Sequence, residues 1–166
     1  MGDGFDGVAR RRAGGILAAA WLAVVATTAS CQVAAAADGV AVPADRLVLA
    51  GTDGRPHGFD ELLGADGRAV CFAFLHPACP LAQEYAPVLE SLAADFAGRG
   101  IRVVGVVCEC DDPAEIGAYR EAFGITFPVH LDTAFRLAEA LDATTTPEAV
   151  LVDRERRIRY AGRIDD

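Results

Sequence analysis

The sequence contains no lysine, and its only serines are Ser30 and Ser91. All fifteen basic residues are therefore arginine, so no side-chain amine is available to form a Schiff base. Ser91 falls within an expected helix and lacks the strand-to-helix turn that exposes the nucleophile of a serine hydrolase. A glycine-rich phosphate-binding motif is also absent from the sequence. These absences leave cysteine as the only strong nucleophile of the chain.

The chain is acidic, with a formal net charge of −9 over 166 residues. Residues 1–37 contribute +1 through three arginines and two aspartates, so the remaining residues carry −10. This excess of negative charge, with no basic stripe, argues against nucleic acids and anionic membrane surfaces as partners. At this length, and with 52% hydrophobic residues, we expect one domain with a substantial core.

The N-terminal segment has the pattern of an export signal. Arg10, Arg11 and Arg12 precede an apolar run over residues 16–29 that is shorter than the ~20 residues of a membrane-spanning helix. Three interpretations remain open: a lipoprotein signal that ends at a lipidated Cys31, ordinary cleavage within the alanines at 34–37, or an uncleaved anchor helix. We therefore predict a signal with a linker over residues 1–37 and a domain over residues 38–166. The protein is expected to be exported, either free in the periplasm or tethered to the membrane through lipid on Cys31.

The rest of the chain alternates buried strands with amphipathic helices. Residues 69–75 and 101–110 are nearly continuous apolar runs, which is typical of strands buried on both faces. The helix between them has apolar residues at helical spacing: Leu81, Tyr85, Leu89, Leu92 and Phe96. Further helices are expected within 111–125 and 132–143, and residues 147–162 read as a closing hairpin. This order predicts an α/β fold in which parallel strands are extended by antiparallel ones.

Cys79 lies where the first buried strand gives way to the long helix. Pro80 suits the first helical position, because proline lacks the N–H that would be unpaired there, and this leaves Cys79 as the N-cap. The backbone N–H groups and the positive end of the helix dipole then point toward its sulfur and favour the thiolate. Because ligands bind at the carboxyl edge of open α/β sheets, Cys79 is our candidate nucleophile.

Cys108 and Cys110 are candidates for a second redox thiol. They follow the strand expected to lie beside the one that precedes Cys79, so both reach the same sheet edge. Neighbouring strands are ~4.8 Å apart and a disulfide needs Cα atoms within ~7 Å, so Cys79–Cys108 and Cys79–Cys110 bridges are both feasible. A strained Cys108–Cys110 bridge and two unpaired thiols are the alternatives. Cys71, inside a buried strand, is expected to act as a small hydrophobic residue.

The same edge also permits a metal-binding interpretation. Cys79, Cys108, Cys110 and His76 would form a soft ligand set suited to Cu(I) or Zn(II). Copper delivery is therefore an alternative to redox catalysis, and a redox-inactive interaction domain is a third possibility. The preferred interpretation needs no cofactor. His57 and His130 belong to no cluster of candidate ligands, so we expect them to be surface residues or histidines with satisfied hydrogen bonds.

Three blocks of the sequence carry a resemblance to a known family: "FAFLHPACPLAQEYAPVLESL", "GIRVVGVVCECDDPAEIGAYREAFGITFPVHLD" and "TTTPEAVLVDRERRIRYAGRI". Over roughly residues 45–164 the chain resembles the thioredoxin-like superfamily, in particular the exported redoxins of the alkyl hydroperoxide reductase and thiol-specific antioxidant group. The resemblance implies a three-layer sandwich, a cis-proline at Pro147, and a substrate groove formed by Thr146, Pro147 and Pro80. It also implies a thiol or protein disulfide as substrate and an external thiol as reductant.

The chain departs from the family pattern at three places. Ala82 stands where a C-x-x-C pair would have its second cysteine, and His76 stands where peroxidase members have threonine. The sequence printed here stops soon after the closing hairpin, so the C-terminal helix of the superfamily is expected to be missing. The prediction is therefore a thiol–disulfide exchange enzyme, with peroxide reduction as a less favoured activity. Cys79 would attack, and Cys110 or Cys108 would resolve the mixed disulfide.

Overall fold

A computed structural model of the chain describes residues 39, 41–110 and 112–165. The predicted signal over 1–37 and Cys31 lie outside the described residues. No helix in the described part is long and apolar enough to cross a membrane. The elements are η1 (Ala44–Arg46), β1 (Val48–Ala50), β2 (Pro56–Gly58), α1 (Phe59–Leu63), β3 (Ala69–Phe74), α2 (Pro80–Ala97), β4 (Ile101–Val107), α3 (Pro113–Phe123), β5 (Val129–Leu131), α4 (Arg136–Leu141), β6 (Glu148–Asp153) and β7 (Ile158–Gly162).

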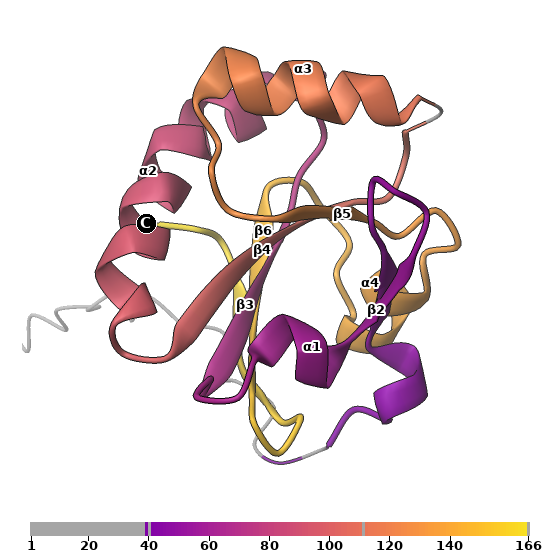
Figure 1. Ribbon diagram of the computed structural model, residues 1–166, viewed down its shortest axis with the longest axis vertical. Coiled ribbons are helices and arrows are strands. Elements are labelled where there is room, and N and C mark those ends of the chain that lie inside the picture. Colours follow the sequence, from indigo (N-terminus) through magenta and orange to yellow (C-terminus); the bar gives the residue numbers. More distant parts are fainter. Residues whose placement is uncertain (1–38, 40, 111, 166) are drawn as a thin grey trace, which may run out of the picture. The chain divides into compact units, whose positions relative to one another are not determined.

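The strands form one seven-stranded mixed sheet in the order β2-β1-β5-β4-β3-β6-β7. β3 and β4 pair in parallel over six residues, and β4 continues in parallel with β5. β6 joins the other side of β3 in antiparallel register and pairs with β7, so the hairpin closes one edge of the sheet (Figure 1). The predicted α/β fold with a mixed sheet is confirmed, and no helix follows β7 within the described residues.

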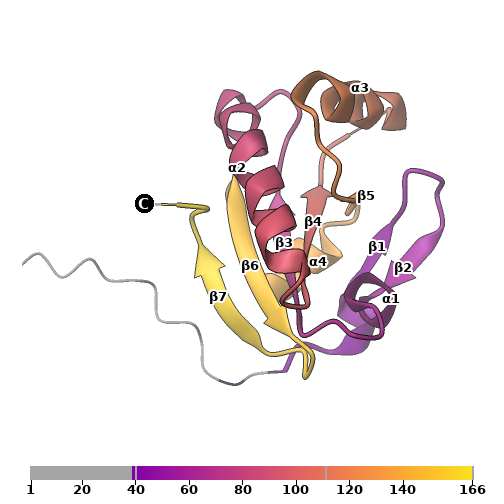
Figure 2. The same cartoon turned by 60° about the vertical axis from the view of Figure 1, so that its left-hand side comes forward.

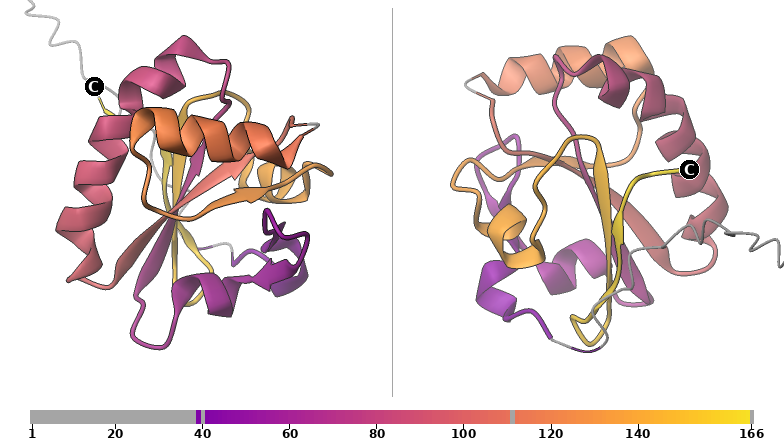
Figure 3. Two further views of the ribbon diagram at one scale, coloured as in Figure 1. Left: turned by 45° about the horizontal axis from the view of Figure 1, so that its top comes forward. Right: turned by 180° about the vertical axis from the view of Figure 1, so that it is seen from behind.

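Each face of the sheet has its own apolar core, which makes the domain three layers thick. One core contains Phe72, Phe74, Val104 and Val106 together with buried residues of α1 and α4. The other contains Ala73, Val103 and Val107 together with buried residues of α2 and α3. Side chains alternate between faces along a strand, so these two sets come from alternate positions. Figures 2 and 3 show the helices on the two sides of the sheet.

The buried face of α2 differs from the predicted one. The residues of α2 that are buried are Ala82, Ala86 and Leu89, and Leu81 is 46% exposed. The spacing rule identified a helix correctly but placed its core face about one residue away from the observed one. The alanines face the sheet because their short side chains let α2 pack closely against it. Pro80 is at the start of α2 and Cys79 is its N-cap, as the sequence indicated.

Candidate active site

Cys79 sits at the end of a tight turn that connects β3 to α2. Its backbone N–H donates to the carbonyl of His76 (2.9 Å), and its own carbonyl accepts from the N–H of Gln83 (3.1 Å). The side-chain amide of Gln83 donates to the carbonyl of Pro77 (2.7 Å). Gln83 therefore ties the first turn of the helix back to the turn that presents Cys79, an interaction that the sequence analysis did not identify.

The loop before β6 supplies the other wall of the site. The peptide bond between Thr146 and Pro147 is cis, as the resemblance implied. The Cys79 thiol points to the carbonyl of Thr146, with 3.8 Å between sulfur and oxygen. The carboxylate of Glu148 accepts hydrogen bonds from the backbone N–H groups of Thr144 and Thr145, which holds this loop in place. Two segments that are 67 residues apart in the sequence thus meet at one thiol.

The structure separates the two candidate resolving cysteines. β4 ends at Val107, one residue before Cys108, which packs against the core on the α1 and α4 side of the sheet. Cys110 packs against the core on the α2 and α3 side, and Cys79 packs against that same core. Alternation within a strand would direct residues two apart to the same side, but β4 ends before Cys108. The bend after Val107 places only Cys110 on the side of Cys79.

The thiols also differ in their electrostatic surroundings. Burial raises the pKa of Cys71 to about 11. Burial, followed by the negative charges of Asp132 and Glu109, raises the pKa of Cys108 to about 11. Both groups therefore stay protonated near neutral pH. Cys110 donates from its sulfur to the carbonyl of Asp112, 3.1 Å away. None of the four described cysteines forms a disulfide in this structure.

Tyr119, in α3, lies beside the candidate nucleophile. Its side chain is 4% exposed, and its hydroxyl donates to the carbonyl of Ala82 in the first turn of α2 (3.2 Å). Burial raises the pKa of Tyr119, and the nearby charge of Cys79 raises it further. The sequence analysis missed this contact because only the packing of α3 against α2 creates it. Tyr119 therefore helps to position the helix turn that carries Cys79.

The alternative metal ligand set is not assembled in the structure. Within the described residues, no three His, Cys, Asp or Glu side chains are grouped so that they could hold a metal ion. Cys108 and Cys110 pack on opposite sides of the sheet. Nδ1 of His76 accepts a hydrogen bond from the N–H of Ala78 (3.1 Å), so this nitrogen is already occupied. The arrangement offers no support for copper delivery through these four residues.

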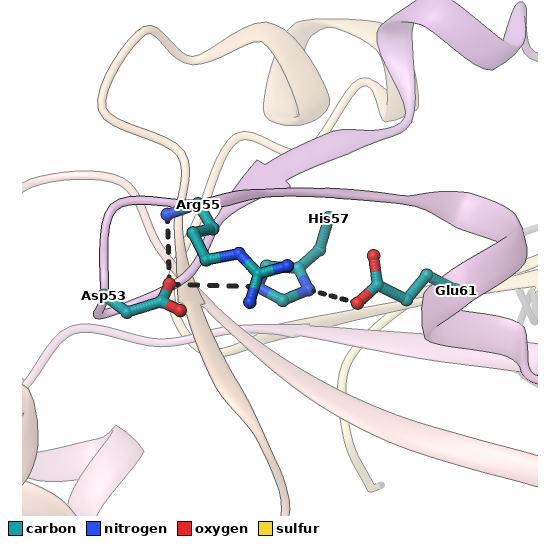
Figure 4. Close-up of polar contacts among 4 residues, drawn as sticks. All are labelled: Asp53, Arg55, His57 and Glu61. Carbon is teal, nitrogen blue, oxygen red and sulfur yellow. Dashed lines mark hydrogen bonds and ion pairs between the residues drawn. The ribbon is translucent and has the colours of Figure 1, made fainter.

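His57 and His130 lie beside each other, a contact that the sequence analysis did not predict. Their rings lie 4.8 Å apart between centroids. Nδ1 of His57 is 2.9 Å from the carboxylate of Glu61, and its Nε2 faces Asp53 at 3.9 Å (Figure 4). His130 is 8% exposed, and its Nδ1 has no hydrogen-bond partner among the described residues. The pair forms where β2 and β5 flank β1 in the sheet, a neighbourhood that sequence spacing does not reveal.

Comparison with solved structures supports the same fold. The chain is similar to a hypothetical protein of Sinorhizobium meliloti (32% identity, 72% of this chain and 67% of that chain, TM-score 0.64). It is also similar to an uncharacterized conserved protein of Geobacillus kaustophilus (26% identity, 77% and 69% covered, TM-score 0.67). A secreted disulfide oxidoreductase of Mycobacterium tuberculosis shares the fold at 19% identity (70% and 84% covered, TM-score 0.57).

A comparison with curated proteins found no match. The family model described as AhpC/TSA family matches residues 40–161, which is most of the chain and includes Cys79, Cys108, Cys110 and Pro147. The match agrees with the thioredoxin-like architecture and with the resemblance carried by the three sequence blocks. The chain therefore belongs to the AhpC/TSA family of thioredoxin-like redoxins.

Proposed function

We propose that the domain catalyses thiol–disulfide exchange, with Cys79 as the attacking thiolate and Cys110 as the resolving thiol. The observation that carries this proposal is the position of Cys79. It caps α2, lies against the carbonyl of Thr146 beside the cis-proline, and shares one apolar core with Cys110. Membership of a redoxin family makes thiols and disulfides the expected reactants.

In the proposed reaction, the Cys79 thiolate attacks one sulfur of a substrate disulfide. The substrate S–S bond breaks, a mixed disulfide forms with Cys79, and the second substrate sulfur leaves as a thiolate that takes a proton from water. Deprotonated Cys110 then attacks the sulfur of Cys79 and displaces the first substrate thiolate. The substrate gains two electrons, and the domain is left with a Cys79–Cys110 disulfide. An external dithiol restores both cysteines by the same exchange.

The remaining site residues have roles in binding and position. The backbone of Thr146, next to Pro147, is the surface along which an extended substrate would lie. Pro80 occupies the first helical position, directly after Cys79, and has no backbone N–H. Cys108 is excluded as the favoured resolving thiol because it packs on the other side of the sheet. Its raised pKa, about 11, also disfavours the thiolate that resolution requires.

The test uses three serine variants and a small peptide disulfide. Cys79→Ser should abolish reduction of the peptide. Cys110→Ser should retain the first attack and accumulate a mixed disulfide with Cys79, detected by mass spectrometry. Cys108→Ser is the matched control and should turn over like the unmodified protein. Full activity of Cys110→Ser with no trapped adduct would refute the assignment of Cys110, and a sulfenic acid on Cys79 formed only with peroxide would favour peroxide reduction instead.

We further propose that the domain is exported. The basic residues and short apolar run before residue 30 support this localisation, and the similarity to a secreted disulfide oxidoreductase agrees with it. Expression of the full chain in a bacterial host, followed by fractionation and mass measurement of the mature protein, tests the proposal. A lipidated N-terminal Cys31 or cleavage near residues 34–37 would support it, and an unprocessed chain in the cytoplasm would contradict it.

A further inference from the structure

A depression of about 250 Å³ adjoins the candidate active site. Thr146, whose carbonyl accepts from the Cys79 thiol, forms part of its wall. His76, whose carbonyl accepts from the backbone N–H of Cys79, forms another part. The depression therefore adjoins two of the residues that contact Cys79, on the side of the sheet where Cys108 packs. A side chain one or two positions from a substrate cysteine would reach it, since an extended chain advances ~3.3 Å per residue.

The charge in this depression is negative. Among the lining residues that the structure describes, Glu109 is the only carboxylate and none is an arginine. Nδ1 of His76 accepts a hydrogen bond from the N–H of Ala78. The charges of Asp132 and Glu109 both act on the Cys108 thiol, which also lines the depression. A cationic group would enter a favourable potential here.

The remaining lining combines apolar side chains with three threonines, Thr144, Thr145 and Thr146. Phe135 is 41% exposed and contributes an aromatic ring to the wall. Its backbone has a φ of 54°, a left-handed conformation that is uncommon for a bulky residue, and it lies directly before α4. Phe74, Leu75, Ala138 and Ala143 also contribute apolar lining. Such a surface suits the methylene stem of a long side chain that keeps its charged end near a carboxylate.

We propose that this depression binds an arginine or lysine side chain that flanks the disulfide under attack, so that the domain prefers substrates with a basic residue beside the reactive cysteine. This inference rests on the proposed thiol–disulfide exchange. Arginine is the better fit, because a guanidinium pairs with a carboxylate through two N–H groups and packs favourably on an aromatic ring. Glu109 and Phe135 are accordingly the specificity-determining residues.

The expected size of the preference follows from the exposure of Glu109. A solvent-exposed ion pair changes an equilibrium about 2–5-fold, and salt screens it. We therefore expect kcat/KM for an arginine-flanked disulfide to exceed that for a serine-flanked one by about this factor at low ionic strength. A glutamate-flanked disulfide should be reduced more slowly than either, and the differences should shrink at 1 M salt, where the Debye length is ~3 Å.

The experiment measures kcat/KM for four peptide disulfides that differ only in Arg, Lys, Ser or Glu next to the cysteine. Glu109→Gln should remove most of the charge preference. Glu155→Gln is the matched control: it changes the net charge equally, but Glu155 lies in the turn after β6, at the opposite end of that strand from Glu148 and the active site. Phe135→Ala should bring the rates for the Arg and Lys peptides together.

The outcomes separate this inference from the proposed function. If the protein reduces the Ser peptide but treats all four flanking residues alike, the basic-residue pocket is refuted and thiol–disulfide exchange stands. If Glu155→Gln removes the preference as fully as Glu109→Gln, the overall charge of the chain is responsible and the pocket is again refuted. If no peptide is reduced, the proposed exchange fails and the specificity inference fails with it.

Discussion

Cys71 and Cys108 should react with an alkylating reagent about 100-fold more slowly than an ordinary cysteine. Burial, and for Cys108 also the charges of Asp132 and Glu109, raises the pKa of each thiol from 9.0 to about 11. Two pKa units correspond to ~100-fold less thiolate at any pH well below 9, and the thiolate is the reactive species. Steric protection by the surrounding core would slow the reaction further. Cys79, at the N-terminus of α2, should react first.

The assay is a time course of iodoacetamide labelling near neutral pH, followed by digestion and mass spectrometry of each cysteine-containing peptide. The rate at Cys108 should rise about tenfold per pH unit up to about pH 11. Asp132→Asn removes the charge that acts most strongly on Cys108 after burial, so this variant should speed labelling of Cys108 and leave Cys71 unchanged. Labelling of Cys108 as fast as Cys79 in the unmodified protein would refute the electrostatic argument and return Cys108 as a candidate resolving thiol.

Three further predictions concern residues around the site and the sheet. Gln83→Leu removes the hydrogen bond to the carbonyl of Pro77, and we expect a several-fold lower kcat with little change in thermal stability. Burial acts to raise the pKa of Glu90, but hydrogen bonds from Thr126 and Phe127 outweigh it and lower that pKa. Glu90→Ala should therefore cost about 1–3 kcal/mol in urea unfolding at pH 7, and less as the pH falls through the folded pKa of Glu90. Burial, and then the charge of His57, lowers the pKa of His130. As the pH falls through ~6.5, His130 therefore binds a proton in the unfolded chain but not in the folded domain. The melting temperature should fall as the pH drops below this value, and a fall of equal size in His130→Gln would contradict the assignment.

Cys79 and Cys110 pack on one side of the sheet, and Cys108 packs on the other. This arrangement is relevant to the missing second cysteine of the C-x-x-C pattern. Ala82 is fully buried against the sheet, and its carbonyl accepts the hydroxyl of Tyr119. Residue 82 is therefore a packing residue of α2 and not a second redox thiol. A resolving thiol from the end of β4 would replace the missing one without any change in α2.

Local signals were sufficient to predict the fold class and the placement of the candidate nucleophile. The continuous apolar run before Cys79 and the proline after it specify a buried strand, a turn and a helix start within a few residues of one another. The cis-proline at Pro147 was predicted from the resemblance, and the structure has it. The sequence analysis misplaced the core face of α2, because a spacing rule counts alanine and leucine equally as apolar residues. Only the close packing of the helix on the sheet favours the smaller side chain at the buried positions.

The contacts that distinguish the thiols depend on tertiary structure. Sequence spacing could not show that β4 ends at Val107 and that the chain then bends, which alone sends Cys108 and Cys110 to opposite cores. The pairing of His57 with His130 and the approach of Tyr119 to Cys79 join residues more than 35 positions apart. The sequence by itself determined where the candidate nucleophile lies, because caps and strand ends are local. The tertiary structure decided which groups surround it, because the register and packing of distant elements set those distances.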